Sequence, residues 1–186
     1  VEVTESAGLT GLPTKAPHVE IADFDNDGWP DILTSASASD GTLPAIFRNS
    51  GEAEVRFEEP AGIGAEQYWV TAPTADFDHD GRLDVLLVEW EPALPSLLLR
   101  NESASGSWLS VYVDAELGHG LGGRVTAYQA CGIGQLYQIL GSAEITVSRA
   151  YAAGVEADAH LGLVSVAAVD LEVVTPGGDS IQLRCD

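Results

Sequence analysis

The chain has few basic residues. Only 8 of its 186 residues are Lys or Arg, against 29 that are Asp or Glu, and the formal net charge is −21. Because phosphate contacts are made chiefly by Lys and Arg, this balance argues against nucleic acid and anionic lipid as partners. A hydrophobic content of 45% argues against disorder, and a chain of this length can bury one sizeable core or two small ones.

Long hydrophobic runs are also missing. Apolar runs such as residues 85–88 and 97–99 have the length of a strand, so no membrane insertion is predicted. The chain begins at Val1 rather than Met and shows no basic segment followed by an apolar one. We therefore expect a mature secreted protein, extracellular or at the cell surface, whose export signal has been removed.

Cysteine is scarce. Cys131 and Cys185 are too far apart in sequence to form a metal-binding pair, and an even count in a secreted chain favours a disulfide between them. Two buried thiols are the alternative, and a count of titratable thiols in the native protein distinguishes the two.

Catalytic motifs are absent as well. The histidines at 18, 79, 119 and 160 lack the spacing of a zinc site, and no nucleophile elbow of the form GxSxG is present. The glycine-rich stretch 118–123 lacks the Lys-Ser/Thr of a phosphate-binding loop. We expect no enzymatic activity, and we interpret these residues as parts of turns and of the packed core.

The sequence does contain a repeated acidic loop. Asp-Phe-Asp-Asn-Asp-Gly-Trp-Pro-Asp at 23–31 returns 53 residues later as Asp-Phe-Asp-His-Asp-Gly-Arg-Leu-Asp at 76–84. Each loop leads into an apolar segment and then into a second one that ends in Arg-Asn, at 48–49 and 100–101. Short segments of this kind, separated by Gly, Pro, Asn and Asp, predict strands and turns.

Alternate aspartates in a tight turn supply the oxygen ligands that calcium requires. We predict one Ca²⁺ per loop, bound by carboxylates at positions one, three, five and nine and by the carbonyl at position seven, with glycine at position six allowing the turn. The predicted ligands of the two sites are Asp23, Asp25, Asp27, Trp29 and Asp31, and Asp76, Asp78, Asp80, Arg82 and Asp84.

Two other interpretations of the loops fit less well. An EF-hand needs a Glu at position twelve, where the chain has Thr34 and Leu87, and it needs helical flanks. An Asp-rich surface turn that hydrogen-bonds its own backbone explains one such loop, but it does not explain two in register.

The pattern changes after the polar segment 101–107. Residues 108–114 alternate with a period of two, and further strands are predicted at 123–130, 135–140, 144–148 and 169–174. Only residues 150–160 fit a helical turn. The predicted fold is all-β, with two calcium-binding repeats over residues 1–104 followed by a β-sandwich or barrel-like domain over residues 105–186.

Two stretches resemble known families. Ala-Asp-Phe-Asp-Asn-Asp-Gly-Trp-Pro-Asp at 22–31, followed by Ile-Phe-Arg-Asn-Ser-Gly at 46–51, resembles the FG-GAP or VCBS repeat of integrin-like β-propellers. Residues 108–178 resemble the ASPIC/UnbV domain through Gly-Leu-Gly-Gly-Arg-Val at 120–125 and Thr-Pro-Gly-Gly at 175–178, although Gly123 replaces Ala and Thr175 replaces Trp. The resemblance implies propeller-blade-like repeats with the loop aspartates as calcium ligands, and a non-catalytic scaffold for adhesion or recognition.

Two repeats cannot close a propeller ring, and open sheet edges need a partner. We therefore expect self-association into a homo-oligomer or filament, with the strand-like segment 1–4 completing a neighbour's sheet. The alternatives are a calcium-dependent adhesion module for a protein receptor or a glycan, and an accessory domain of a larger secreted protein.

Overall fold

The computed structural model describes residues 1–9, 18–35, 43–64, 68–103, 106–114, 116, 120–148 and 154–185. The contacts of the chain divide it into two compact units. The first comprises residues 1–24, 29–102 and 148–154, and the second comprises residues 25–28, 103–147 and 155–186. In the described residues the regular structure is strands and one 3₁₀ turn, which confirms the all-β prediction.

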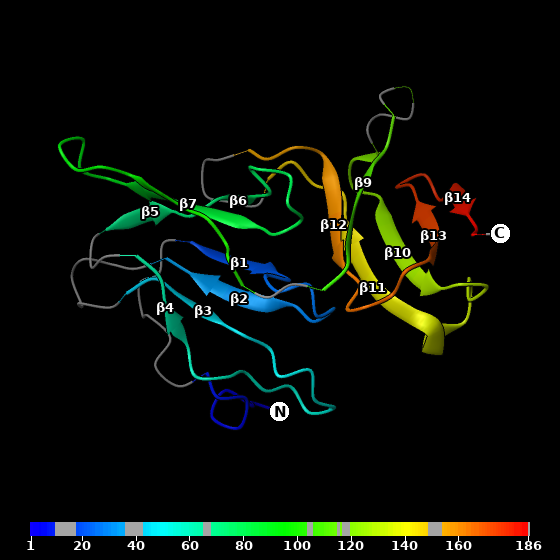
Figure 1. Ribbon diagram of the computed structural model, residues 1–186, viewed down its shortest axis with the longest axis horizontal. Coiled ribbons are helices and arrows are strands. Elements are labelled where there is room, and N and C mark those ends of the chain that lie inside the picture. Colours follow the sequence, from blue (N-terminus) through cyan, green and yellow to red (C-terminus); the bar gives the residue numbers. More distant parts are fainter. Residues whose placement is uncertain are drawn as a thin grey trace. The chain divides into compact units, whose positions relative to one another are not determined.

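The first repeat folds into a four-stranded antiparallel sheet in chain order. Strands β1 (Val19–Ala22), β2 (Asp31–Thr34) and β3 (Ala45–Phe47) lie side by side, and the short β4 (Ala61–Gly62) pairs with β3 (Figure 1). Sequential antiparallel pairing of this kind follows from short connections that contain turn residues. The first aspartate loop is the connection between β1 and β2.

The second repeat forms a sheet around one long strand. This strand, β7 (Asp84–Glu89), pairs with β5 (Trp69–Thr71), β6 (Thr74–Ala75) and β8 (Leu97–Leu99). β7 and β8 follow the second aspartate loop as β2 and β3 follow the first, so the duplicated sequence corresponds to duplicated structure.

The core of the first unit joins both repeats. Its buried members come from the loops and strands of each repeat, and they are Phe24, Leu33, Trp69, Ala72, Leu83, Val85 and Leu87. Burial of a side chain the size of Leu or Phe stabilises the fold by about 1.5–3 kcal/mol. Since Phe24 and Leu83 are themselves loop residues, the same burial that stabilises the core also fixes the aspartate loops.

Strand β1 presents its faces in an unexpected way. Its apolar side chains Val19 and Ile21 are exposed, while the carboxylate of Glu20 is buried. The Thr74 hydroxyl donates to Glu20 Oε1 at 2.6 Å, and His18 Nε2 lies 3.5 Å from Glu20 Oε2. The Thr74 hydroxyl therefore satisfies Oε1, whereas Glu20 Oε2 and His18 Nε2 are buried without a hydrogen bond to the described residues.

The second unit has two sheets with a shared core. A four-stranded antiparallel sheet has the order β11-β10-β13-β14, and a two-stranded one pairs β12 with β9. The strands are β9 (Trp108–Tyr112), β10 (Arg124–Gln129), β11 (Ile139–Glu144), β12 (Asp158–Gly162), β13 (Val169–Val174) and β14 (Ser180–Leu183). Buried residues of both sheets form one cluster, for example Val125 and Leu161, so the unit packs as a sandwich.

Four local predictions differ from the structure. The strand predicted at 144–148 is not formed, because β11 ends at Glu144 and Thr146 makes an isolated bridge with Asp158. Residues 136–138 form a 3₁₀ turn, since Leu136 and Tyr137 are exposed and lack a core to face, and the strand begins only at Ile139. The expected helical turn at 150–160 lies partly outside the described residues, and its end belongs to strand β12. The segment 1–4 is not a strand, because it enters a turn in which Leu9 N–H donates to the Thr4 carbonyl at 3.0 Å.

Among the described residues, no helix has the length and apolar character needed to cross a membrane.

Candidate metal centre

The first aspartate loop turns sharply between β1 and β2. Asn26 and Gly28, at positions four and six, have positive φ angles of 57° and 88°. Glycine adopts this conformation at little cost, and asparagine tolerates it better than most residues. The turn brings one carboxylate oxygen from each of Asp23, Asp25 and Asp27 within 4.8 Å of the others.

The second loop repeats this backbone between β6 and β7. His79 and Gly81 have φ angles of 59° and 84° at the positions that Asn26 and Gly28 occupy in the first loop. Because positive φ is uncommon outside glycine, its recurrence at matching positions indicates that the two loops share one conformation. The oxygens of the second cluster also lie within 4.8 Å of one another, and they belong to Asp76, Asp78 and Asp80.

The donor set of each cluster fits a hard divalent cation. Calcium takes six to eight oxygen ligands, with carboxylates prominent among them. Three carboxylates at this spacing repel one another, and a bound cation would remove that repulsion. The carbonyls of Trp29 and Arg82 stay predicted ligands at position seven.

The aspartates at position nine have a further role. Asp31 is buried, and its two carboxylate oxygens accept hydrogen bonds from the backbone N–H groups of Phe24 at 3.0 Å and Asn49 at 2.8 Å. Asp84 accepts the equivalent bonds from Phe77 at 3.3 Å and Asn101 at 2.8 Å. Neither residue belongs to a three-carboxylate cluster. Each one stabilises its loop through hydrogen bonds to the backbone, and its predicted role as a calcium ligand stays a prediction.

The Asn of each Arg-Asn pair completes this brace. The Asn49 amide donates to the Pro30 carbonyl, and the Asn101 amide donates to the Leu83 carbonyl, both at 3.2 Å. The Asn101 amide also donates to the Phe24 carbonyl at 2.7 Å. Sequence analysis identified Arg-Asn only as a mark of the repeat. Its recurrence at a similar distance after each loop, 18 residues after Asp31 and 17 after Asp84, was the signal that pointed to a structural role.

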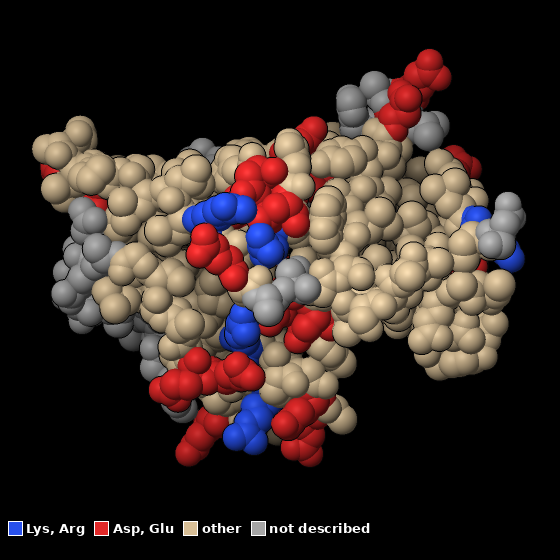
Figure 2. Space-filling model, in the orientation of Figure 1, with Lys and Arg blue, Asp and Glu red and all other residues tan. Residues whose placement is uncertain are grey.

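Two arginines neutralise part of the second cluster. Arg100 contacts Asp78 at 2.8 Å and Asp80 at 3.2 Å, and Arg82 also pairs with Asp80. Desolvation, the largest single influence, raises the pKa of Asp80, but the hydrogen bonds from Arg82 and Arg100 together outweigh it and hold that pKa below its ordinary value. On the face drawn in Figure 2, basic side chains lie directly against acidic ones in the same way.

The two cysteines are free thiols in the structure, so the predicted disulfide is not formed there. Both lie beside the buried carboxylate of Asp170, which accepts hydrogen bonds from the Cys185 backbone N–H at 3.0 Å and from the Cys185 thiol at 3.1 Å. These bonds lower the pKa of Asp170 and raise the pKa of the Cys185 thiol. The Cys131 backbone contributes to the same shift at Asp170.

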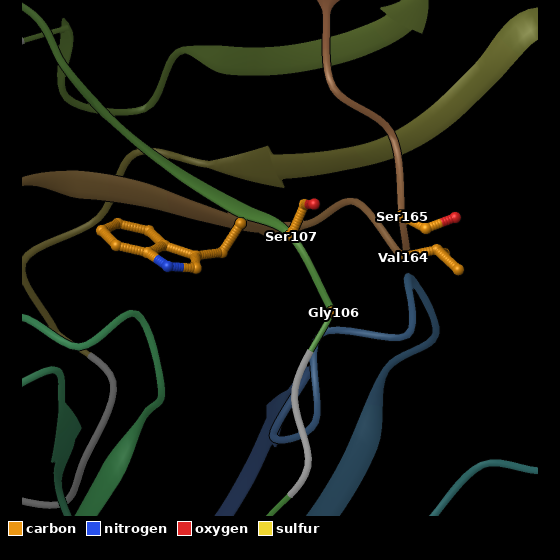
Figure 3. A pocket seen from close by; sticks show the side chains of 5 residues that line it. Gly106, Ser107, Val164 and Ser165 are labelled. Atoms are coloured by element: carbon orange, nitrogen blue, oxygen red, sulfur yellow. The ribbon is translucent and has the colours of Figure 1, made fainter.

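The tip of the first loop, residues 25–28, belongs to the second unit. Asn26 is fully buried, and its Oδ1 lies 2.9 Å from Nε2 of His160. The His160 ring stacks on Trp108, with centroids 6.0 Å apart and planes inclined by 15°. An open pocket of about 590 Å³ adjoins this cluster, with Ser107, Val164 and Ser165 on its walls (Figure 3). Sequence analysis interpreted His160 only as a turn or packing residue.

Comparison with known families supports the first half of the interpretation. Residues 23–87 match the FG-GAP-like repeat, and this segment contains both aspartate clusters. The match supports an FG-GAP repeat protein, and repeats of this kind are β-propeller-type modules that are typically extracellular and commonly bind calcium. It does not extend to residues 108–178, whose resemblance to ASPIC/UnbV stays a prediction. No curated protein matches the chain.

Proposed function

We propose that this chain is an extracellular, non-catalytic β module that binds two calcium ions, one in each aspartate loop. The observation that carries the proposal is the pair of three-carboxylate clusters with the same backbone turn, inside a segment that matches the FG-GAP-like repeat. The first ion is held by Asp23, Asp25 and Asp27 and the second by Asp76, Asp78 and Asp80, with the Trp29 and Arg82 carbonyls as further ligands.

Calcium serves this protein as a structural brace. Each loop joins two strands of one sheet and carries a core residue, Phe24 or Leu83, so a cation that orders the loop also stabilises the sheet. A ligand that binds only the folded state stabilises it by about 2.7 kcal/mol at a free concentration of 100 times its Kd. A bound cation also offsets the mutual repulsion of the clustered carboxylates, which adds to this effect.

Isothermal titration of calcium into chelator-stripped protein tests the proposal. We expect two sites per chain, with one lost in Asp25→Asn/Asp27→Asn and the other lost in Asp78→Asn/Asp80→Asn. Magnesium is the control ion, and it should bind more weakly because it dehydrates reluctantly and prefers to keep its waters. Absence of calcium binding by the folded, stripped protein would refute the proposal.

A second candidate function is self-association through the edge of the first sheet. Among the described residues, β1 pairs with β2 alone, and its side chains Val19 and Ile21 are 53% and 59% exposed. An edge strand with exposed apolar residues is a template for pairing with another chain. Because segment 1–4 is not a strand, β1 itself is the proposed contact, and a second copy of this chain is its partner.

Light scattering and negative-stain microscopy in the presence of calcium test self-association. We expect oligomers or filaments that disappear in Ile21→Lys, since the charged side chain blocks edge pairing. Leu136→Lys is the matched control, because it places the same charge at an exposed apolar residue of the other unit. A strictly monomeric wild-type protein at high concentration contradicts this second function and leaves calcium binding intact.

A further inference from the structure

The two aspartate loops differ at position four. In the first loop this residue is Asn26, which is fully buried. In the second loop it is His79, which is exposed to solvent although its backbone has the same left-handed conformation. The backbone therefore predicts two equivalent sites, but the surroundings of the two loop tips are different.

The Asn26 side chain is held by a specific partner. Because its Oδ1 accepts a hydrogen bond, His160 Nε2 carries the proton, and Nδ1 of the same ring accepts one from the Ser110 hydroxyl at 3.3 Å. Stacking on Trp108 fixes the plane of the ring. The imidazole is thus fixed in orientation and tautomer by three neighbours, and all of these residues belong to the second unit.

The backbone of the same loop tip is fixed as well. The Asn26 carbonyl accepts a hydrogen bond from Val164 N–H at 3.1 Å, and the Asp25 carbonyl accepts one from Gly106 N–H at 3.3 Å. A methyl group on Gly106 would lie 2.5 Å from the Asn26 carbonyl oxygen, so the approach requires glycine at position 106. Asn26 is flanked in sequence by Asp25 and Asp27, and the bonds that fix it therefore also fix the segment that carries two of the three clustered carboxylates.

From these contacts we infer that His160 is a positioning residue of the first aspartate loop and that it raises the affinity of that loop for calcium. The inference rests on the proposed calcium function. A loop that is already ordered loses less conformational entropy when a cation binds, which raises its affinity.

Single-site backgrounds separate the two loops in the experiment. Asp78→Asn/Asp80→Asn leaves the first site alone, and Asp25→Asn/Asp27→Asn leaves the second alone. Calcium is titrated calorimetrically into each background after chelator stripping. We expect His160→Ala to raise the Kd of the first site by roughly three- to tenfold, which corresponds to the loss of one neutral hydrogen bond. The same substitution should leave the second site unchanged.

Three variants distinguish positioning from a general loss of structure. His160→Gln retains a side-chain N–H donor, so it should restore part of the affinity that His160→Ala loses. Asn26→Gly removes the acceptor but adopts positive φ without strain, so it should reproduce the effect of His160→Ala, and the two changes combined should not add. His79→Ala is the matched control at position four of the second loop, and it should change neither Kd.

The outcomes separate the inference from the function on which it rests. If wild-type protein binds no calcium, both the positioning role of His160 and the calcium function are wrong. If it binds two ions but His160→Ala alters neither affinity, or weakens both sites equally, the positioning role is wrong and the calcium function stands. If His160→Ala does not fold, Asn26→Gly decides, because an unchanged first-site Kd in that variant overturns the inference.

Discussion

Replacement of Asp31 by asparagine distinguishes a structural brace from a simple metal ligand. The Asp31 carboxylate is 1% exposed and accepts two backbone hydrogen bonds, from Phe24 and Asn49. A hydrogen bond to a charged group contributes about 1.5–3 kcal/mol. Asparagine keeps one acceptor oxygen and turns an NH₂ group toward the other N–H, so one bond is lost.

We therefore expect Asp31→Asn to lower the free energy of unfolding of the chelated protein by about 1.5–3 kcal/mol. In a chain of this size, 1 kcal/mol corresponds to about 2–4 °C in Tm, so Tm should fall by about 3–12 °C. Asp31→Ala, which removes both acceptors, should cost about twice as much. Asp84→Ala should cost less than Asp31→Ala, because one of its donors belongs to the exposed Phe77.

The assay is denaturant unfolding with excess chelator, followed by the fluorescence of Trp69, which is fully buried in the core of the first unit. Asp25→Asn is the comparison, since removal of a charge from the cluster relieves repulsion and should not destabilise the chelated protein. An Asp31→Asn variant as stable as wild type in chelator, and weakened only in calcium, would refute the brace and assign Asp31 to the metal alone.

Three further predictions concern charged groups and thiols. Arg100→Ala removes the ion pair with Asp78 and one of the two arginines that contact Asp80, so calorimetry should find tighter calcium binding at the second loop, whereas unchanged affinity would show that Arg100 does not compete. The pKa of Asp170 is lowered in the folded state, so its contribution to stability is present above its unfolded pKa and is lost as pH falls through the folded value. The free energy of unfolding should therefore decline as pH falls through the acidic range, and this decline should be shallower in Asp170→Asn than in the wild-type protein. Because hydrogen bonding to Asp170 raises the pKa of Cys185, alkylation of that thiol should accelerate in Asp170→Asn, and a native thiol count of zero would instead establish a Cys131–Cys185 disulfide.

The loops and the main strands could be predicted because their signals are local. Alternate aspartates followed by glycine specify a tight acidic turn within nine residues, and the apolar segments on either side specify strands. The failures also have local causes. The exposed Leu136 and Tyr137 suggest a strand by composition, but the structure gives them nothing to pack against. At β1, Glu20 is buried between the exposed Val19 and Ile21, and its Oε1 accepts a hydrogen bond from Thr74, 54 residues away, which no local pattern indicates.

The sequence by itself determined that two acidic turns recur 53 residues apart, because each turn is built from residues that are neighbours in the chain. Only the tertiary structure decided how the turns differ and what supports them. Asp31 is braced by Asn49, 18 residues away, and Asn26 is held by His160, 134 residues away. Hydrogen bonds over such separations depend on how the strands pack, and no local pattern records that packing. The chemistry of each turn is therefore encoded locally, while the hydrogen bonds that hold it come from distant residues.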